Sequence, residues 1–122
     1  MFNILVIDDS LLMRNIAREA LEEEGFTVTD LLPETVEALK ERIQSAPPDL
    51  VLSDFNMPLV DGLDVARTVR QVNAKIPVII LSANRDEARD AHLKAMGVRA
   101  ILYKPIKGEA IVAAVAKVLV GS

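Results

Sequence analysis

Short apolar runs alternate along this chain with segments whose apolar residues recur at helical spacing, and this alternation limits the folds it can adopt. Continuous runs rich in β-branched residues predict buried strands at residues 4–7, 50–52, 78–81 and 100–102. A fifth run at 26–32 follows Gly25, alternates more weakly, and predicts an edge strand. These five segments are the candidate strands of one sheet.

Helical periodicity predicts a helix after each of these strands. In the first helix Ser10 is the expected N-terminal cap and Gly25 the expected end. The second starts near Pro33, the third follows Asp61-Gly62, the fourth covers about 85–96, and the last covers about 107–120. The apolar positions of the first three are Met13, Ile16, Ala17, Ala20 and Leu21; Val36, Leu39 and Ile43; and Val65, Val69 and Val72.

Strands that alternate with helices and form continuous apolar runs favour a parallel sheet covered by helices on both faces. The pattern is a βα unit repeated five times, with no long linker between the units. We therefore expect a single α/β domain of the (βα)5 doubly wound type that spans residues 1–122.

Composition narrows the function classes. The sequence has no Cys, which excludes disulfides, thiolate zinc sites and a cysteine nucleophile. The one His, His92, has no second His or Cys near it, which favours a structural or surface role over a metal site. A net charge of −4 repels nucleic-acid phosphates, so direct nucleic-acid binding is not expected. The longest apolar stretch, near 110–116, is too short to cross a bilayer, and a cytoplasmic location is expected.

The residues at or just beyond the ends of the apolar runs carry the chemistry of this sequence. The first run is followed by Asp8 and Asp9, and the third, fourth and fifth strands lead to Asp54, Ser82 and Lys104. In an open parallel sheet the functional crevice lies outside the carboxyl ends of the strands. We therefore expect these five side chains to cluster at one edge of the sheet.

Three carboxylates in one place repel one another and raise one another's pKa, which implies a bound cation. Oxygen ligands without His or Cys fit a hard ion, and a site with few protein ligands and several waters suits Mg²⁺ better than Ca²⁺. The Lys104 ammonium and the Ser82 hydroxyl add two further groups that neutralise phosphoryl oxygens. Asp54 is thus arranged to accept an electrophilic phosphoryl group.

The same residues resemble the motifs of a known family, the response-regulator receiver domains of two-component signalling. The resemblance covers essentially the whole chain, and it is specific because the motifs occur together and in order. They are Asp8-Asp9-Ser10 with Arg14, the segment 49–54, Met57-Pro58, Asp61-Gly62, Ser82-Ala83, Gly97 and Lys104-Pro105. The resemblance implies a flavodoxin-like strand order 2-1-3-4-5 and a cis peptide bond between Lys104 and Pro105.

The resemblance also implies roles for individual residues. Asp54 would be the phosphoacceptor, and Ser82 and Lys104 would bind the phosphoryl oxygens. Mg²⁺ would be held by Asp8, Asp9, Asp54 and the backbone carbonyl of Asn56. The phosphodonor would be a sensor histidine kinase or a histidine phosphotransfer protein, and the acyl phosphate would change the binding of a downstream protein partner. No enzymatic activity is expected beyond the chain's own aspartyl phosphorylation and dephosphorylation.

One position departs from the family pattern. Three residues before Lys104, where many receivers have Tyr or Phe, this sequence has Ile101. Strand alternation makes the neighbouring Tyr103 point to the opposite face from Lys104. The route by which phosphorylation of Asp54 reaches a partner surface therefore stays open.

Two other functions stay open at this level. A receiver-like binding module that needs no phosphorylation would bind its partner regardless of Asp54. A Mg²⁺-dependent phosphatase of the haloacid dehalogenase kind would need an acid two residues after its aspartyl nucleophile, where this sequence has Asn56. The output is equally open among a freestanding chemotaxis-type regulator, a phosphorelay shuttle and a fragment of a longer regulator.

Two surfaces are candidates for partner contact. Leu11 and Leu12 begin the first helix beside the acidic residues, off its apolar stripe, and are candidates for docking the phosphodonor. Ala110, Ala113 and Ala114 are expected on the exposed face of the last helix, where they either form a partner or homodimer surface or simply favour the helix.

Overall fold

Each apolar run forms a strand of one parallel sheet in the computed structural model, which describes residues 1–121; Ser122 lies outside the described residues. The strand order is β2-β1-β3-β4-β5, as the family resemblance implied. The strands are β1 (Asn3–Ile7), β2 (Thr27–Leu31), β3 (Leu50–Asp54), β4 (Val78–Ser82) and β5 (Val98–Tyr103). The third and fourth strands are longer than predicted and include Asp54 and Ser82, so both side chains are anchored in the sheet.

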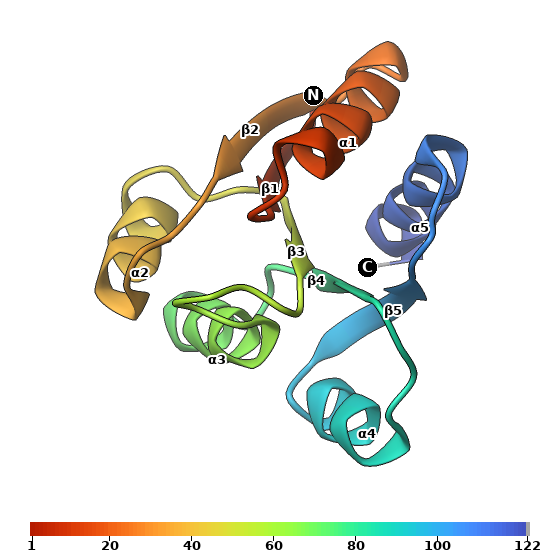
Figure 1. Ribbon diagram of the computed structural model, residues 1–122. Helices are drawn as coiled ribbons and strands as arrows, with labels where there is room; N and C mark the ends of the chain where they lie inside the picture. The colour runs from red at the N-terminus through yellow and green to blue at the C-terminus, as the bar shows by residue number, and fades with distance from the viewer. Residues whose placement is uncertain (122) are drawn as a thin grey trace.

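Helices cover both faces of the sheet, as the alternation predicted. In Figure 1, α1 and α5 lie on one side of the strands and α2, α3 and α4 on the other. The helices are α1 (Leu11–Glu23), α2 (Val36–Ser45), α3 (Gly62–Val72), α4 (Glu87–Ala95) and α5 (Gly108–Gly121). The fold is the predicted doubly wound (βα)5 arrangement.

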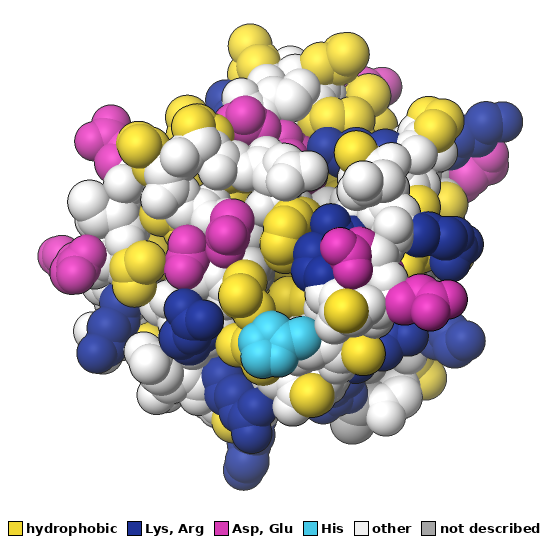
Figure 2. Space-filling model, turned by 60° about the horizontal axis from the view of Figure 1, so that its bottom comes forward, with side chains coloured by type: hydrophobic (Ala, Val, Ile, Leu, Met, Phe, Trp, Pro, Cys, Tyr) yellow, Lys and Arg dark blue, Asp and Glu magenta, His cyan; other side chains and the backbone are white. Residues whose placement is uncertain are grey.

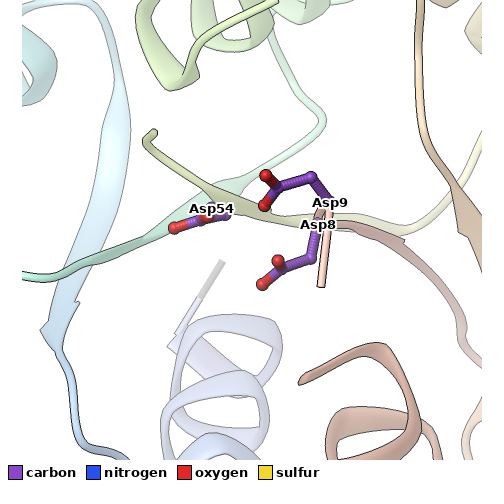
Figure 3. Close-up of side chains that lie close together, drawn as sticks. All are labelled: Asp8, Asp9 and Asp54. Atoms are coloured by element: carbon purple, nitrogen blue, oxygen red, sulfur yellow. The ribbon is translucent and has the colours of Figure 1, made fainter. Parts of the chain in front are cut away.

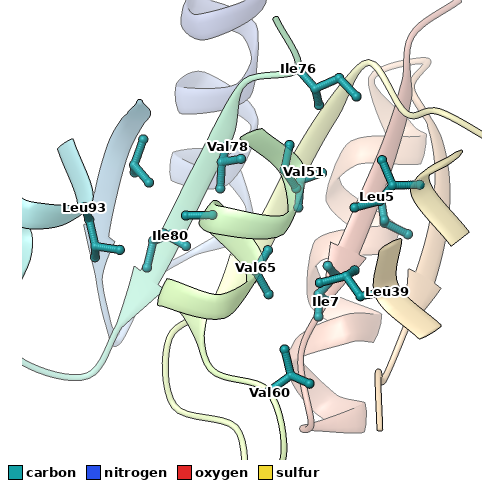
Figure 4. Packing of buried hydrophobic residues seen from close by; sticks show 14 residues of the cluster. Leu5, Ile7, Leu39, Val51, Val60, Val65, Ile76, Val78, Ile80 and Leu93 are labelled. Carbon is teal, nitrogen blue, oxygen red and sulfur yellow. The ribbon is translucent and has the colours of Figure 1, made fainter. Parts of the chain in front are cut away.

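Alternation along the strands divides the core into two layers. In β1, Ile4 and Val6 pack toward α1 and α5, whereas Leu5 and Ile7 pack toward α2 and α3. Figure 4 shows the second layer, in which Val65 of α3 and Leu39 of α2 cover the sheet. All four of these β1 side chains are at most 2% exposed, so the strand is buried on both faces, as is typical of a parallel sheet with helices on both sides.

Four of the helices, α1 to α4, begin at polar caps, only some of which were predicted. Ser10 caps α1 by accepting a hydrogen bond from the backbone N–H of Met13, as expected. The second helix begins at Val36, capped by Thr35, and not near Pro33, which lies before the cap. Asp86 caps α4, so this helix begins later than the predicted position. Each cap satisfies an N–H that has no partner inside the helix.

A β-bulge in β5 separates the two halves of that strand. Val78 pairs with Val98, but the next residue, Ile79, pairs with Ala100, which leaves Arg99 as an extra residue. The side chains after the bulge therefore change faces relative to Val98. Ile101 packs into the layer beneath α3 and α4.

The surface of α5 differs in one position from the prediction. Ala110 and Ala113 are exposed, but Ala114 is half-buried and packs against the layer beneath α1 and α5. The reason is helical spacing: Ile111, Ala114, Val115 and Val118 fall at i, i+3, i+4 and i+7 and share the inner stripe of the helix. Within residues 1–121, no helix has the length and apolar character needed to cross a membrane.

Candidate functional site

The carboxyl ends of β1 and β3 bring three carboxylates together. One oxygen from each of Asp8, Asp9 and Asp54 lies within 4.8 Å of the others. Figure 3 shows the three side chains turned toward a common space. Asp8 and Asp54 are buried, at 2% and 6% exposure, whereas Asp9 is exposed. The sheet therefore supplies an acidic pocket with one open side.

Lys104, at the end of β5, places its ammonium against this pocket. Its Nζ lies 3.1 Å from Oδ1 of Asp54 and 3.8 Å from Oδ2 of Asp8. The backbone of Lys104 is fixed by its N–H, which donates to the carbonyl of Ser82 at 2.7 Å. The peptide bond between Lys104 and Pro105 is cis, as the resemblance implied. Four of the five predicted strand-end side chains thus gather at one place.

The electrostatics of the pocket disfavour three ionised carboxylates. Burial raises the pKa of Asp8, and the charges of Asp54 and Asp9 raise it further. Burial also raises the pKa of Asp54, an effect that its hydrogen bond and ion pair with Lys104 only partly offset. The pocket carries more negative charge than its own cation balances.

The donor set fits a hard divalent cation. Oδ1 of Asp8 accepts the N–H of Ser10 at 2.9 Å, but the buried Oδ2 accepts no hydrogen bond from the described residues. The Lys104 ammonium, 3.8 Å away, is too far to donate to this oxygen, and a buried carboxylate oxygen without a donor is costly unless a cation comes closer. The carbonyl of Asp8 is held by Arg14, whose guanidinium donates to it at 2.6 Å. The carboxylate oxygens of Asp8, Asp9 and Asp54, with no His or Cys among the gathered side chains, suit Mg²⁺.

Ser82 and Asn56 stand apart from these carboxylates in their contacts. The Ser82 hydroxyl donates to the carbonyl of Asn84 at 2.7 Å and accepts from the guanidinium of Arg89 at 2.7 Å. Asn56 lies in the loop after β3 and is exposed. His92 is exposed on α4, outside the carboxylate group, and is the cyan side chain in Figure 2.

Comparison with known proteins decides the family. Residues 4–116 match the family model described as the response regulator receiver domain. This chain belongs to that family. It is therefore a receiver domain of two-component signal transduction, and domains of this family interact with histidine kinases and downstream effectors.

Individual relatives agree with this assignment. The receiver domain is 32% identical to the chemotaxis protein CheY of Halobacterium salinarum, over 95% of each chain. It is 40% identical to the response regulator MprA of Mycobacterium ulcerans, over 90% of this chain but only 47% of that protein. Among solved structures, the Vibrio cholerae chemotaxis protein CheY4 superposes with a TM-score of 0.87 at 25% identity, covering 97% of this chain and 98% of that one.

Sequence reasoning missed Arg89 of this receiver domain. The guanidinium contacts Ser82, and it also lies 4.4 Å from the centre of the Phe55 ring. The available signal was position: Arg89 falls in the first turn of the helix that follows Ser82, so its long side chain can reach back to the strand end.

Proposed function

We propose that Asp54 is the phosphoacceptor of this receiver domain and that a histidine kinase or histidine phosphotransfer protein is the donor. The observation that carries the proposal is the position of Lys104, whose ammonium lies 3.1 Å from Oδ1 of Asp54 in a pocket with two further carboxylates. An ammonium in this position can neutralise charge on a phosphoryl oxygen during transfer.

The reaction is a phosphoryl transfer between nucleophiles. An oxygen of the Asp54 carboxylate forms a bond to phosphorus, and the bond from phosphorus to the donor's imidazole nitrogen breaks. The nitrogen leaves with the electron pair and takes up a proton from solvent. The product is an aspartyl phosphate, whose hydrolysis returns Asp54 to the carboxylate and releases inorganic phosphate.

The chain's own residues have separate tasks in this step. The Lys104 ammonium orients the Asp54 carboxylate and then pairs with a phosphoryl oxygen, and the Ser82 hydroxyl donates to another. Asp8, Asp9, Asp54 and the backbone carbonyl of Asn56 are the proposed ligands of Mg²⁺. When bound, Mg²⁺ would supply positive charge that offsets the carboxylates and the phosphoryl oxygens.

The wider setting is part of the same proposal. The receiver domain spans residues 1–122, is located in the cytoplasm, and catalyses no reaction beyond its own phosphorylation and dephosphorylation. The acyl phosphate changes its affinity for a downstream protein partner; coupling of this kind is typically about 1–3 kcal/mol. The exposed Leu11 and Leu12, at 62% and 69%, support a donor-docking surface beside the pocket.

Acetyl phosphate tests the acceptor. Incubation with acetyl phosphate and Mg²⁺ should add the mass of one phosphoryl group, with acetate as the leaving group, and peptide mapping should place it on Asp54. Asp54→Asn should remain unmodified, whereas Asp49→Asn, an acid outside the pocket, should be modified like the parent. An unmodified parent chain, or equal modification of Asp54→Asn, would contradict the proposal.

Two outcomes would favour the alternatives. Sustained turnover of a small phosphate ester would indicate a phosphatase, although Asn56 stands where such an enzyme needs an acid. Partner binding that is the same for the parent and Asp54→Asn, with and without acetyl phosphate, would indicate a module that works without phosphorylation.

A further inference from the structure

We propose that Arg89 is a positioning residue that holds the Ser82 hydroxyl in the loop between β4 and α4. Phosphorylation of Asp54 breaks the hydrogen bond between Arg89 and this hydroxyl. The inference rests on the proposed function, because it concerns the hydroxyl that would bind a phosphoryl oxygen. Arg89 acts through Ser82, and its release changes the surroundings of Tyr103.

The first step is the hydrogen bonding of Ser82. A serine hydroxyl has one proton to donate and two lone pairs. The proton is committed to the carbonyl of Asn84 at 2.7 Å, and one lone pair accepts from the Arg89 guanidinium at 2.7 Å. A phosphoryl oxygen on Asp54 needs the same proton. Ser82 must therefore turn away from the loop, and Arg89 then loses one of its acceptors.

The second step is the way Arg89 is held. Its guanidinium lies 4.4 Å from the centre of the Phe55 ring, which follows Asp54 in the chain. The same guanidinium donates to the Asn84 carbonyl at 2.8 Å and to Oδ1 of Asp90 at 3.1 Å. The side chain is 18% exposed. These contacts aim the donor at Ser82, so the hydroxyl meets a fixed group and not a mobile surface arginine.

The third step leads from Arg89 to the surface. Asp90, which accepts from Arg89 through Oδ1, accepts from the Tyr103 hydroxyl through Oδ2. The Arg85 guanidinium covers the Tyr103 ring at 4.1 Å from its centre. Asp90, Tyr103 and Arg85 line a surface hollow of about 370 Å³ between α4 and β5. A change at Ser82 therefore reaches a surface that a partner can contact.

The side chain at position 101 makes this connection specific to the chain. Ile101 sits opposite Ile80 in the sheet and packs into the core layer beneath α3 and α4. It carries no hydrogen-bonding group and cannot respond to Ser82 by exchanging a partner. Arg89 is in direct contact with Ser82 and supplies the polar link that Ile101 lacks.

The test measures the rate of Asp54 phosphorylation by acetyl phosphate in the presence of Mg²⁺. Arg89→Ala should be phosphorylated about tenfold faster than the parent, since breaking a hydrogen bond from a charged donor is no longer part of the step. Arg89→Lys, which keeps the charge but loses the planar fork, should be intermediate. Arg67→Ala, an exposed arginine of α3, should match the parent.

A double-mutant cycle separates positioning from a general effect on α4. If Arg89 acts through Ser82, the acceleration by Arg89→Ala should vanish when Ser82→Ala is also present. An equal acceleration in both backgrounds overturns the proposal, as does an unchanged or slower rate in the Arg89 variants. If Arg89→Ala does not fold by circular dichroism, Arg89→Lys is taken through the same cycle.

The fluorescence of Tyr103 provides the second readout, because the chain has one Tyr and no Trp. Phosphorylation should change this fluorescence in the parent and in Arg67→Ala but not in Arg89→Ala, with equal phosphate incorporation verified by mass. The same change in Arg89→Ala, or none in a phosphorylated parent, overturns the link. A parent chain that takes up no phosphate would instead refute the proposed function itself.

Discussion

The Tyr103 hydroxyl donates a hydrogen bond to the carboxylate of Asp90 and so ties the end of β5 to α4. This bond raises the pKa of Tyr103, with burial and the charge of Asp90 adding to the effect. It is also the main reason that the pKa of Asp90 lies below its ordinary value. Each of the two side chains therefore shifts the pKa of the other, upward for Tyr103 and downward for Asp90.

The ultraviolet absorbance of tyrosinate measures this relationship directly. Tyr103 should ionise above the ordinary pKa of about 10. Asp90→Asn should lower its pKa toward the ordinary value, because the charged acceptor is gone. Glu41→Gln, an exposed acid of α2, should leave the titration unchanged. Identical titrations for the parent and Asp90→Asn would show that the bond does not form in solution.

The acidic pocket should lower the stability of the metal-free chain at neutral pH. The pKa of Asp54 is raised in the folded state, so its contribution to stability is fully present below the unfolded pKa and is lost as pH rises through the folded pKa. In the presence of a metal chelator, Asp54→Asn should raise the free energy of unfolding near pH 7 by about 1 kcal/mol. The gain should shrink toward pH 4, as urea denaturation can measure. A destabilised variant at neutral pH would contradict this account.

Mg²⁺ binding should restore the stability that the acidic pocket costs the metal-free chain. A ligand that binds only the folded state stabilises it by about 2.7 kcal/mol at 100 times its Kd. Thermal unfolding of the parent should therefore shift upward on Mg²⁺ addition and return on chelation. Asp8→Asn should lose most of the shift, because the buried Oδ2 of Asp8 is one of the oxygens that the ion would contact. Glu41→Gln should keep it, and an equal loss in this control would indicate a nonspecific charge effect.

The start of α3 has no room for a side chain. A Cβ on Gly62 would lie 2.9 Å from the Cα of Phe55, a backbone atom that cannot move aside without displacing the residue next to Asp54. Gly62→Ala should cost about 1–3 kcal/mol of stability. Gly121→Ala in α5, where a Cβ meets nothing within 4 Å, should be close to neutral in the same denaturation experiment. Similar midpoints for the two variants would refute the steric argument.

The strand-end logic explains how much of the site could be predicted. Parallel strands bring their carboxyl ends to one edge, so Asp8, Asp9, Asp54 and Lys104 could be placed together from their positions alone. The hydrogen bonds of Ser82 could not be predicted in this way, because they depend on the rotation of its side chain and on the reach of Arg89 from another element. A strand end specifies which side chains are near, and tertiary contacts decide where a hydroxyl points.

The fold shows the same division. Apolar periodicity predicted every element because burial depends on spacing, which the sequence displays. The cap at Thr35 and the bulge at Arg99 were missed, since each replaces one local hydrogen-bond pattern by another without changing the apolar pattern.

The bulge decides where the segment between Gly97 and Lys104 can change length. Strand side chains alternate with a period of two, and Arg99 is the extra residue that stands between Val98 and its paired successor Ala100. Deleting Arg99 would restore regular pairing and leave Val98, the phenol over α4 and the ammonium at Asp54 on their present faces. Deleting a residue between Ala100 and Leu102 while the bulge remains would make Tyr103 and Lys104 exchange faces. Related chains should therefore be able to lose a residue at the bulge but not in the paired residues that follow it.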